Sequence, residues 1–305
     1  MTKILVTGGA GFIGSHTIEL LLQQGHEVCV LDNLFSGKIE NLPLTHPNLE
    51  FFEGDILEYP LLEDLLGDCS AVLHLAAIAS VPFTIDNPIY SSQVNTQGLL
   101  HVLEAIRKTK RAIRLVYASS AAVYGDSNEL PCRDDLPLTA LPLSPYALQK
   151  REAEEYADLY RRLHGIKSIG LRYFNVYGEG QDPNSPYSGV ISRFLQAYQE
   201  GCELTLFGDG LQSRDFISVK DVARANVLAL QQALHGVFNI ATGQAQTLLQ
   251  LVQYIEAAGG KKALLRFAEA RAGDIRASYG AVEKAVDELG FSYSLDLREG
   301  IKLFF

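Results

Sequence analysis

The chain has 305 residues, of which 47% are hydrophobic, and its formal net charge is −10 at pH 7. This size allows a full α/β core, and an acidic chain without a basic cluster is not expected to bind nucleic acid or a membrane surface. The four cysteines show no metal-ligand spacing, so reduced and mostly buried thiols are expected. The sequence starts directly with a predicted strand and has no bilayer-length apolar run, which predicts a cytoplasmic protein without a signal peptide.

The first predicted elements are a strand, a glycine turn and a helix within residues 3–14, KILVTGGAGFIG. The apolar run at 4–6 predicts a buried strand, and helical periodicity follows directly after the turn. Gly8, Gly11 and Gly14 suit a tight turn, close approach of the backbone to phosphate, and close packing of helix on strand. Backbone N–H groups and a helix N-terminus arranged in this order can hold a pyrophosphate. The stretch therefore predicts a dinucleotide site.

A second apolar strand, at 28–31, ends on Asp32, eighteen residues past Gly14. An acidic side chain at this position can accept hydrogen bonds from the adenosine ribose hydroxyls, and it repels a 2′-phosphate. The predicted cofactor is therefore NAD, favoured over NADP.

Further strands are predicted at 49–53, 71–75 and 113–118, with a long helix at 95–108. Alternating strands and helices predict a doubly wound parallel sheet of the Rossmann type, with helices on both faces. Asp55 follows the third strand, where it can either reach the adenine or cap the next helix, and the sequence leaves both readings open. Ala76 and Ala77 follow the fourth strand, and their small side chains leave room for a cofactor.

The second half continues with a helix from Ser144 and a strand at 169–174, followed by a Gly- and Pro-rich loop at 178–189. Later elements are predicted at 190–200, 204–207, 219–233, 236–240 and 248–258. We expect residues 1–174 to form the NAD-binding domain, with 213–245 returning to it. Residues 175–305 are expected to form a smaller, interleaved substrate lobe.

Tyr146 and Lys150 are four residues apart on the predicted helix and therefore share one face. A phenol has a reference pKa near ~10, too high for a base at neutral pH. A neighbouring lysine, together with a positively charged nicotinamide, favours the phenolate and lowers that pKa. Ser120 ends the neighbouring strand, where it can bond the same substrate oxygen. These three residues are the predicted catalytic group.

With these motifs, the chain resembles the extended short-chain dehydrogenase/reductases, particularly the nucleotide-sugar 4-epimerases, and most of all those acting on UDP-N-acetylglucosamine. The motifs appear in the family's order across nearly the whole chain. They are Gly8-Gly9-Ala10-Gly11-Phe12-Ile13-Gly14, Asp32, Asp55-Ile56, Ser119-Ser120, Tyr146 to Lys150, Arg172-Tyr173-Phe174-Asn175-Val176-Tyr177-Gly178, Phe207-Gly208-Asp209-Gly210, Arg214-Asp215-Phe216 and Arg271-Ala272-Gly273-Asp274.

The resemblance implies roles for individual residues. Tyr146 is the general base, Lys150 holds the nicotinamide ribose, and Ser120 assists the tyrosine. Further cofactor contacts are implied for Phe12, Ile13, Asn33, Ile56, Leu75 and Tyr173. Implied substrate contacts are Ser80, Ser119, Gln181 and Val190, with Asn175 on the sugar diphosphate, Arg214 and Arg271 on the phosphates, and Asp274 on the uridine ribose. Each of the two arginines could equally well form a surface ion pair instead of binding phosphate. Guanidinium groups nevertheless suit a diphosphate.

Two small features bear on the reaction and the substrate. Relatives that dehydrate or decarboxylate a sugar place an acidic residue two positions after the catalytic serine or threonine, whereas this chain has Ala121 and Ala122. A 4-keto intermediate can then only be reduced again, which implies 4-epimerisation. Residues 77–82 and 173–184 resemble the branch acting on UDP-N-acetylhexosamines. Ser278, where some glucose-restricted relatives carry tyrosine, leaves volume for a 2-acetamido group.

The resemblance implies interconversion of UDP-N-acetylglucosamine and UDP-N-acetylgalactosamine, with UDP-glucose and UDP-galactose as further substrates. It also implies a homodimer that pairs residues 93–108 and 148–163 of each subunit. One alternative is a UDP-uronic acid 4-epimerase, which an added basic group facing C6 would favour. A second alternative, from another class, is a catalytically silent NAD-binding regulator; the intact Ser120, Tyr146 and Lys150 oppose it.

Overall fold

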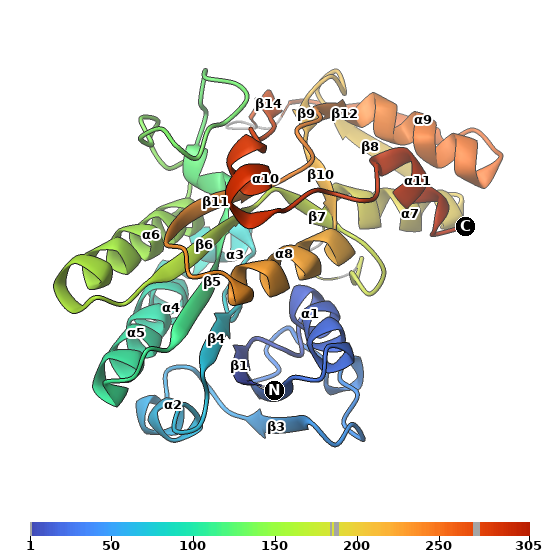
Figure 1. The fold of residues 1–305 in the computed structure, drawn as a ribbon. Coiled ribbons are helices and arrows are strands. Elements are labelled where there is room, and N and C mark those ends of the chain that lie inside the picture. The colour runs from blue at the N-terminus through green and yellow to red at the C-terminus, as the bar shows by residue number, and fades with distance from the viewer. Residues whose placement is uncertain (1, 184, 186–188, 271–274) are drawn as a thin grey trace.

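The computed structural model describes residues 2–183, 185, 189–270 and 275–305. Within these ranges a seven-stranded parallel sheet forms the centre, in the order β11-β6-β5-β4-β1-β2-β3 (Figure 1). Its strands are β1 (Lys3–Thr7), β2 (Glu27–Asp32), β3 (Leu49–Glu53), β4 (Ala71–His74), β5 (Arg114–Ser120), β6 (Ser168–Tyr173) and β11 (Gly236–Ile240). The predicted doubly wound α/β fold is confirmed.

Helices cover both faces of this sheet because its strands are apolar on both sides. Ile4 and Val6 of β1 point into a core shared with α1 and α8, while Leu5 points into a second core shared with α2, α5 and α6 (Figure 1). The helices of this half are α1 (Phe12–Gln23), α2 (Tyr59–Leu65), α3 (Val81–Asp86), α4 (Pro88–Ser92), α5 (Gly98–Thr109), α6 (Pro145–His164) and α8 (Val219–Gln231), with short turns η1 (Ile39–Asn41) and η3 (Ala121–Tyr124).

The helix predicted at 95–108 begins differently in the structure. The chain forms α4 and then a π-helical turn, η2 (Gln93–Gln97), before α5 starts at Gly98. Asn95 lies in that turn and bonds the backbone of Ile78 twice: its Oδ1 accepts from the N–H at 2.7 Å, and its Nδ2 donates to the carbonyl at 3.0 Å. Such turns are frequent at functional sites. Asn95 Nδ2 also donates to Gln149 Oε1, so this turn fixes the segment that follows β4 beside α6.

Among the described residues, the second lobe is built from small sheets of two or three short strands and from three helices. Its helices are α7 (Val190–Glu200), α9 (Leu248–Gly259) and α11 (Leu297–Lys302), whereas α10 (Glu283–Leu289) packs with Ala285 and Leu289 in the core that α8 and β11 share. Its strands are β7 (Asn175–Tyr177) beside β10 (Phe216–Ser218), β8 (Glu203–Phe207) beside β13 (Leu264–Ala268), and β9 (Ser213–Arg214) between β12 (Gln246–Thr247) and β14 (Ala277–Ser278). The chain leaves the sheet after β6 and returns to it as β11, whereas the predicted domain boundary at residue 174 stays a prediction.

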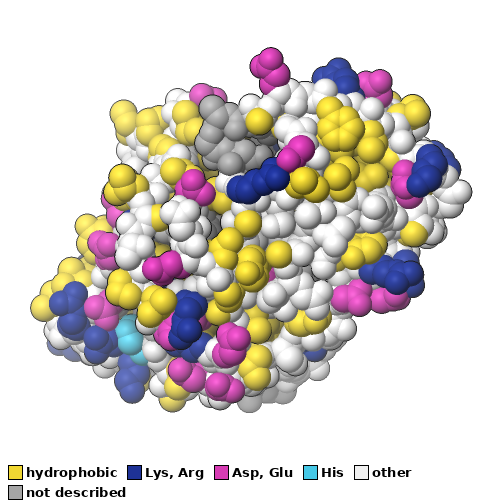
Figure 2. All heavy atoms as spheres, turned by 90° about the horizontal axis from the view of Figure 1, so that it is seen from above, with side chains coloured by type: hydrophobic (Ala, Val, Ile, Leu, Met, Phe, Trp, Pro, Cys, Tyr) yellow, Lys and Arg dark blue, Asp and Glu magenta, His cyan; other side chains and the backbone are white. Residues whose placement is uncertain are grey.

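The surface carries charges of both signs. On the face drawn in Figure 2, lysine and arginine side chains lie beside aspartate and glutamate side chains. Ion pairs among the described residues include Arg107 with Glu104 and Arg161 with Asp158. In the part of the chain that the structure describes, no helix has both the length and the apolar character needed to cross a bilayer.

Asp215 provides a test of how the lobe is joined to the sheet. This fully buried carboxylate accepts hydrogen bonds from the Thr242 N–H (2.8 Å), the Thr242 hydroxyl (2.7 Å) and the Gly243 N–H (2.9 Å), just after β11. Asp215→Ala leaves these donors unpaired, and each unpaired buried group costs about 1–3 kcal/mol. We expect the free energy of unfolding, measured by chemical denaturation, to fall by at least that amount.

The matched control is Asp209→Ala in the same lobe. Asp209 is half exposed and pairs with Arg276 at the surface, so its removal should leave the free energy of unfolding nearly unchanged. Equal destabilisation by the two substitutions would contradict the role assigned to Asp215.

Candidate active site

A cleft of about 1250 Å³ lies at the carboxyl ends of the strands, between the sheet and the second lobe. Ligands of open α/β sheets bind at this edge. The cleft is lined by every residue that the sequence assigned to the cofactor: Gly8, Gly11, Phe12, Ile13, Gly14, Asp32, Asn33, Asp55, Ile56, Leu75, Ala76, Ala77, Tyr146, Lys150 and Tyr173.

The glycine turn leaves no space for side chains. Gly8 has a φ of +71°, and a Cβ there would lie 2.6 Å from the Ala76 nitrogen. A Cβ on Gly14 would lie 2.5 Å from the Gly8 oxygen. Gly11 stands at the N-cap of α1, so the first N–H groups of that helix face the cleft without a side-chain cap. A cradle of backbone donors at a helix N-terminus fits a pyrophosphate.

Asp32 links the glycine turn to the end of β2. Its Oδ2 accepts from the Ala10 N–H at 2.9 Å and its Oδ1 from the Leu34 N–H at 2.8 Å. Burial raises the pKa of this carboxyl, and the two backbone bonds oppose that rise. Each carboxylate oxygen keeps a second lone pair. Asp32 can therefore also accept hydroxyl donors of a ribose in the cleft.

Asp55 does not cap the helix that follows it. Glu58 occupies the N-cap position of α2, and the Asp55 Oδ1 instead accepts from the Leu57 N–H at 2.9 Å, which closes a turn. Its Oδ2 accepts from Asn33 Nδ2 at 2.8 Å, so the ends of two neighbouring strands are joined at the cleft wall. The predicted contact of Asp55 with adenine stays a prediction.

Ser120, Tyr146 and Lys150 come together in the middle of the cleft. The Ser144 hydroxyl caps α6 by accepting from the Ala147 N–H at 3.1 Å, and this places Tyr146 and Lys150 in the first two turns. Lys150 Nζ donates to the Ala118 carbonyl at 2.9 Å and lies 5.8 Å from the centre of the Tyr146 ring.

In the protein alone, burial has the largest effect on the charges of this group. Burial lowers the pKa of Lys150 to about 8, although Glu154 opposes the change. Burial also raises the pKa of Tyr146, and a hydrogen bond with Ser120 offsets only part of that rise. In the protein alone the Lys150 ammonium therefore does not lower the pKa of Tyr146 below its ordinary value. A positive charge on a bound ligand is needed to favour the phenolate.

The predicted substrate residues fall into three groups. Ser119, Ser120, Asn175, Gln181 and Val190 line the cleft. Ser80, Arg214 and Ser278 do not line it in the described structure: the Ser80 hydroxyl accepts from the Phe83 N–H, Arg214 Nη1 donates to the Ile275 carbonyl at 2.7 Å, and Ser278 is the register partner of Arg214. Arg271 and Asp274 lie outside the described residues. The binding roles of all these residues stay predictions.

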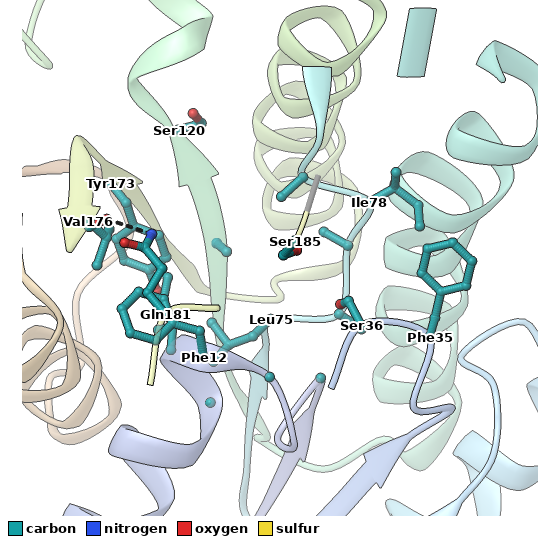
Figure 3. Close-up of a pocket in the computed structure, with 18 of the residues that line it drawn as sticks. Phe12, Phe35, Ser36, Leu75, Ile78, Ser120, Tyr173, Val176, Gln181 and Ser185 are labelled. Carbon is teal, nitrogen blue, oxygen red and sulfur yellow. Dashed lines mark hydrogen bonds between the residues drawn. The ribbon is translucent and has the colours of Figure 1, made fainter. Parts of the chain in front are cut away.

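Two cross-cleft contacts have no signal in the sequence. Lys38 Nζ, in the loop after β2, pairs with Asp182 Oδ2 at 2.8 Å, and His16 bonds the Glu179 carbonyl at 2.9 Å. Both join residues more than a hundred positions apart, so no local pattern predicts them. They tie the segment after β7, including Gln181, to the dinucleotide half. Figure 3 shows Gln181 beside Phe12 and Tyr173, with Phe35 and Ile78 across the cleft.

Comparison with known proteins extends these observations. Residues 4–241 match the model of the NAD dependent epimerase/dehydratase family. A UDP-glucose 4-epimerase of Mycolicibacterium smegmatis is 36% identical, over 98% of this chain and 96% of that protein. A solved UDP-N-acetylglucosamine 4-epimerase from Methanobrevibacter ruminantium, in complex with UDP-N-acetylmuramic acid, is 37% identical with a TM-score of 0.92, over 99% of this chain and 98% of that one. The Thermus thermophilus UDP-glucose 4-epimerase in complex with NAD is 37% identical with a TM-score of 0.89, over 99% and 97%.

The role of Asp32 can be tested by NAD binding. Asp32→Ala removes charge-assisted hydrogen bonds to the ribose, each worth about 1.5–3 kcal/mol, so we expect the dissociation constant of NAD to rise roughly 10- to 100-fold. Titration calorimetry on protein stripped of cofactor measures this change, with Asp209→Ala as the remote control. Equal affinity of the unaltered protein for NAD and NADP would contradict the assignment.

Proposed function

The chain belongs to the NAD-dependent epimerase/dehydratase family, and on that premise we propose that it interconverts UDP-N-acetylglucosamine and UDP-N-acetylgalactosamine. UDP-glucose and UDP-galactose are proposed as further substrates. The cofactor is NAD, and the glycine cradle, the buried Asp32 carboxylate and the size of the cleft fit it.

Each of the three proposed catalytic residues has a separate role in the oxidation and re-reduction of C4. Bound NAD supplies reversible hydride transfer. Tyr146 removes the proton of the 4-hydroxyl group and later returns one, while the Ser120 hydroxyl bonds the same oxygen. Lys150, held by the Ala118 carbonyl, keeps a cation beside the phenol. The cleft would also have to let the keto-sugar turn, because reduction on the opposite face is what inverts C4.

One observation favours epimerisation over elimination. All carboxylates that line the described cleft lie at its dinucleotide end, and each already accepts hydrogen bonds or forms an ion pair. They are Asp32, Asp55 and Asp182. The first two accept from backbone and Asn33 donors, and the third pairs with Lys38. Directly after Ser120, η3 offers Ala121 and Ala122. Dehydration needs a second acid or base beside the sugar, and these residues supply none, so re-reduction is the remaining course.

The choice of N-acetylated sugars rests on finer support. The related enzyme from Methanobrevibacter ruminantium acts on UDP-N-acetylglucosamine, as its name states, and it covers nearly the whole chain. Ser278 is small at a position where some glucose-restricted relatives carry a bulky tyrosine. It lies on β14, next to Arg214 on β9, within the substrate lobe. A small side chain there suits an acetamido group.

The charges of the cleft bear on the two alternatives. The cations that line it, among the described residues, are Lys38 and Lys150. Lys38 pairs with Asp182 and Lys150 belongs to the catalytic group, so neither provides the added basic group that a uronic acid carboxylate would favour. A catalytically silent regulator has no need of Ser120, Tyr146 and Lys150 in one place. Incubation with UDP-GlcNAc and with UDP-Glc, followed by sugar analysis, tests the proposal against both alternatives.

We also propose a homodimer that pairs residues 93–108 and 148–163. Leu148 and Leu163, at the ends of the second segment, are 46% and 64% exposed, so they offer apolar surface to a partner.

In the proposed division of the chain into domains, residues 1–174 and 213–245 hold NAD, and the lobe within 175–305 holds the UDP-sugar. A cytoplasmic location stays a prediction from the sequence.

Tyr146→Phe tests the general base. The substitution keeps the ring and removes only the titrating oxygen, so the fold and NAD binding should survive. Turnover should fall by at least ~10²-fold, the lower end for a lost general base. Tyr160→Phe, on the same helix, removes a hydroxyl that donates to Glu104 and should leave turnover intact. Near-normal turnover of the Tyr146 variant would show that this tyrosine is structural.

Ser278→Tyr tests the choice of sugar. If Ser278 lies beside C2, a ring at this position excludes the acetamido group but leaves room for a 2-hydroxyl. Steric exclusion discriminates further than one lost methylene contact, which is worth about 1–3 kcal/mol. We expect kcat/KM to collapse for UDP-GlcNAc and to persist for UDP-Glc. A parallel fall for both sugars, or no change for either, would remove Ser278 as the selector.

A further inference from the structure

A buried ion pair lies directly behind the catalytic group. Glu154 of α6 and Arg172 of β6 meet in a fork, with Nε to Oε1 at 2.8 Å and Nη2 to Oε2 at 2.6 Å. Their side chains are 9% and 4% exposed. Neither residue lines the described cleft, and neither takes part in the reaction proposed above.

The two ends of this pair hold the residues on either side of Ser120. The Ser119 hydroxyl donates to Glu154 Oε1. On the other side, Arg172 Nη1 donates to the hydroxyl of Tyr124, the last residue of η3, at 2.8 Å. The Tyr124 hydroxyl in turn donates to Asn239 Oδ1 of β11 at 2.7 Å. The segment that carries Ser120 therefore bonds to the same ion pair on both sides of this serine, through Ser119 before it and through Tyr124 after it.

The same pair is also part of the catalytic helix. Glu154 lies one turn beyond Lys150 and two turns beyond Tyr146, on the same face of α6. The Glu154–Arg172 pair thus joins the strand end that carries Ser120 to the helix that carries Tyr146 and Lys150. Stability alone is a weak reason for such a pair, because buried ion pairs often stabilise a fold no better than apolar side chains of similar volume.

We propose that Glu154 and Arg172 are positioning residues, which set the distance of Ser120 from Tyr146 and Lys150 through Ser119 and Tyr124. This inference rests on the proposed epimerase function. It gives Ser119 a different role from the substrate contact that the sequence suggested, because its hydroxyl donates to Glu154. Catalytic groups need placement to a fraction of an ångström, which second-layer hydrogen bonds provide.

The pair also sets the charge around Lys150. Glu154 raises the pKa of Lys150 against the larger, lowering effect of burial. The other titratable groups facing this region are Tyr146 on the same helix, His74 on β4, Tyr117 on β5 and Tyr173 on β6. Burial lowers the pKa of His74 to about 3 and raises those of the three phenols, so they are neutral in the protein alone. Arg172 is charged and is paired with Glu154. Removing the Glu154 carboxylate should therefore lower the pKa of Lys150.

Ser119→Ala and Tyr124→Phe are the mild tests, because each removes one hydroxyl and leaves the ion pair in place. Misplacement of a catalytic group costs about 10- to 100-fold in turnover, so kcat should fall by this amount while KM and NAD content stay unchanged. Ser168→Ala is the matched control: its buried hydroxyl has no hydrogen-bond partner in the described structure, so kcat should not change. A raised KM with normal kcat in Ser119→Ala, or normal kcat in both variants, overturns the proposal.

Glu154→Gln is the sharper test, with Glu154→Asp as the conservative rescue. The alkaline limb of the kcat–pH profile should move to lower pH in the glutamine variant, since Lys150 loses its proton earlier, and should return toward the original position in the aspartate variant. A merely structural role would lower kcat without moving that limb, and this result overturns the proposal. If the glutamine variant does not fold, Ser119→Ala and Tyr124→Phe decide.

A readout independent of turnover separates this inference from the proposed function. The rate of Lys150 modification by an amine-reactive reagent, followed by mass spectrometry across pH, reports the protonation of Lys150 directly. Its midpoint should lie at lower pH in Glu154→Gln than in the unaltered protein, and an unchanged midpoint overturns the inference. Absence of epimerisation by the unaltered protein contradicts the proposed function, while the labelling midpoint still tests the inference.

Discussion

The close packing of Gly8 against the backbone at Ala76 is the constraint on which the cleft depends. Any Cβ at position 8 would lie within 3 Å of that backbone, and a Cβ on Gly14 would lie equally close to the oxygen of Gly8. The first turn of α1 therefore packs on the glycine turn that follows β1, and this turn packs on the segment that follows β4. Asp32 reinforces this arrangement by accepting the Ala10 N–H. The same backbone contacts therefore determine the shape of the phosphate cradle and the position of Asp32, the proposed acceptor for the ribose hydroxyls.

The negative net charge of the protein opposes the binding of its anionic ligands. With a net charge of −10, the chain cannot attract a diphosphate through its overall field. The dinucleotide end instead offers N–H groups at a helix N-terminus, which act over short distances. Its carboxylates are each engaged, as in the pair of Asp182 with Lys38. In the proposed catalytic group, Lys150 is a buried cation of depressed pKa, so binding there depends on local geometry rather than on net charge.

The sequence predicted the parallel sheet and the NAD cofactor, and it singled out the proposed catalytic group, because each has a local signal. Gly8, Asp32 and Lys150 stand at fixed spacings within short motifs, and the fold brings those motifs to one sheet edge. It did not predict what depends on distant partners. The π-turn before α5 follows from bonds between Asn95 and Ile78, and the direction of the Ser119 hydroxyl follows from Glu154 on another element. Side-chain direction at such positions is set by tertiary contacts that no spacing encodes.

The position of β11 at the edge of the sheet has a consequence for synthesis on the ribosome. Every residue of β6 is buried in the finished protein, and its outer edge pairs with residues 236–240. More than sixty residues therefore emerge between β6 and its partner strand, as the residue numbers of the two strands show. During this interval the nascent chain presents an apolar, unpaired strand edge, the kind of surface that recruits other chains. Because the substrate lobe is inserted between β6 and β11, β11 is synthesised late. Its pairing with β6 then covers the exposed edge and protects the nascent protein from aggregation.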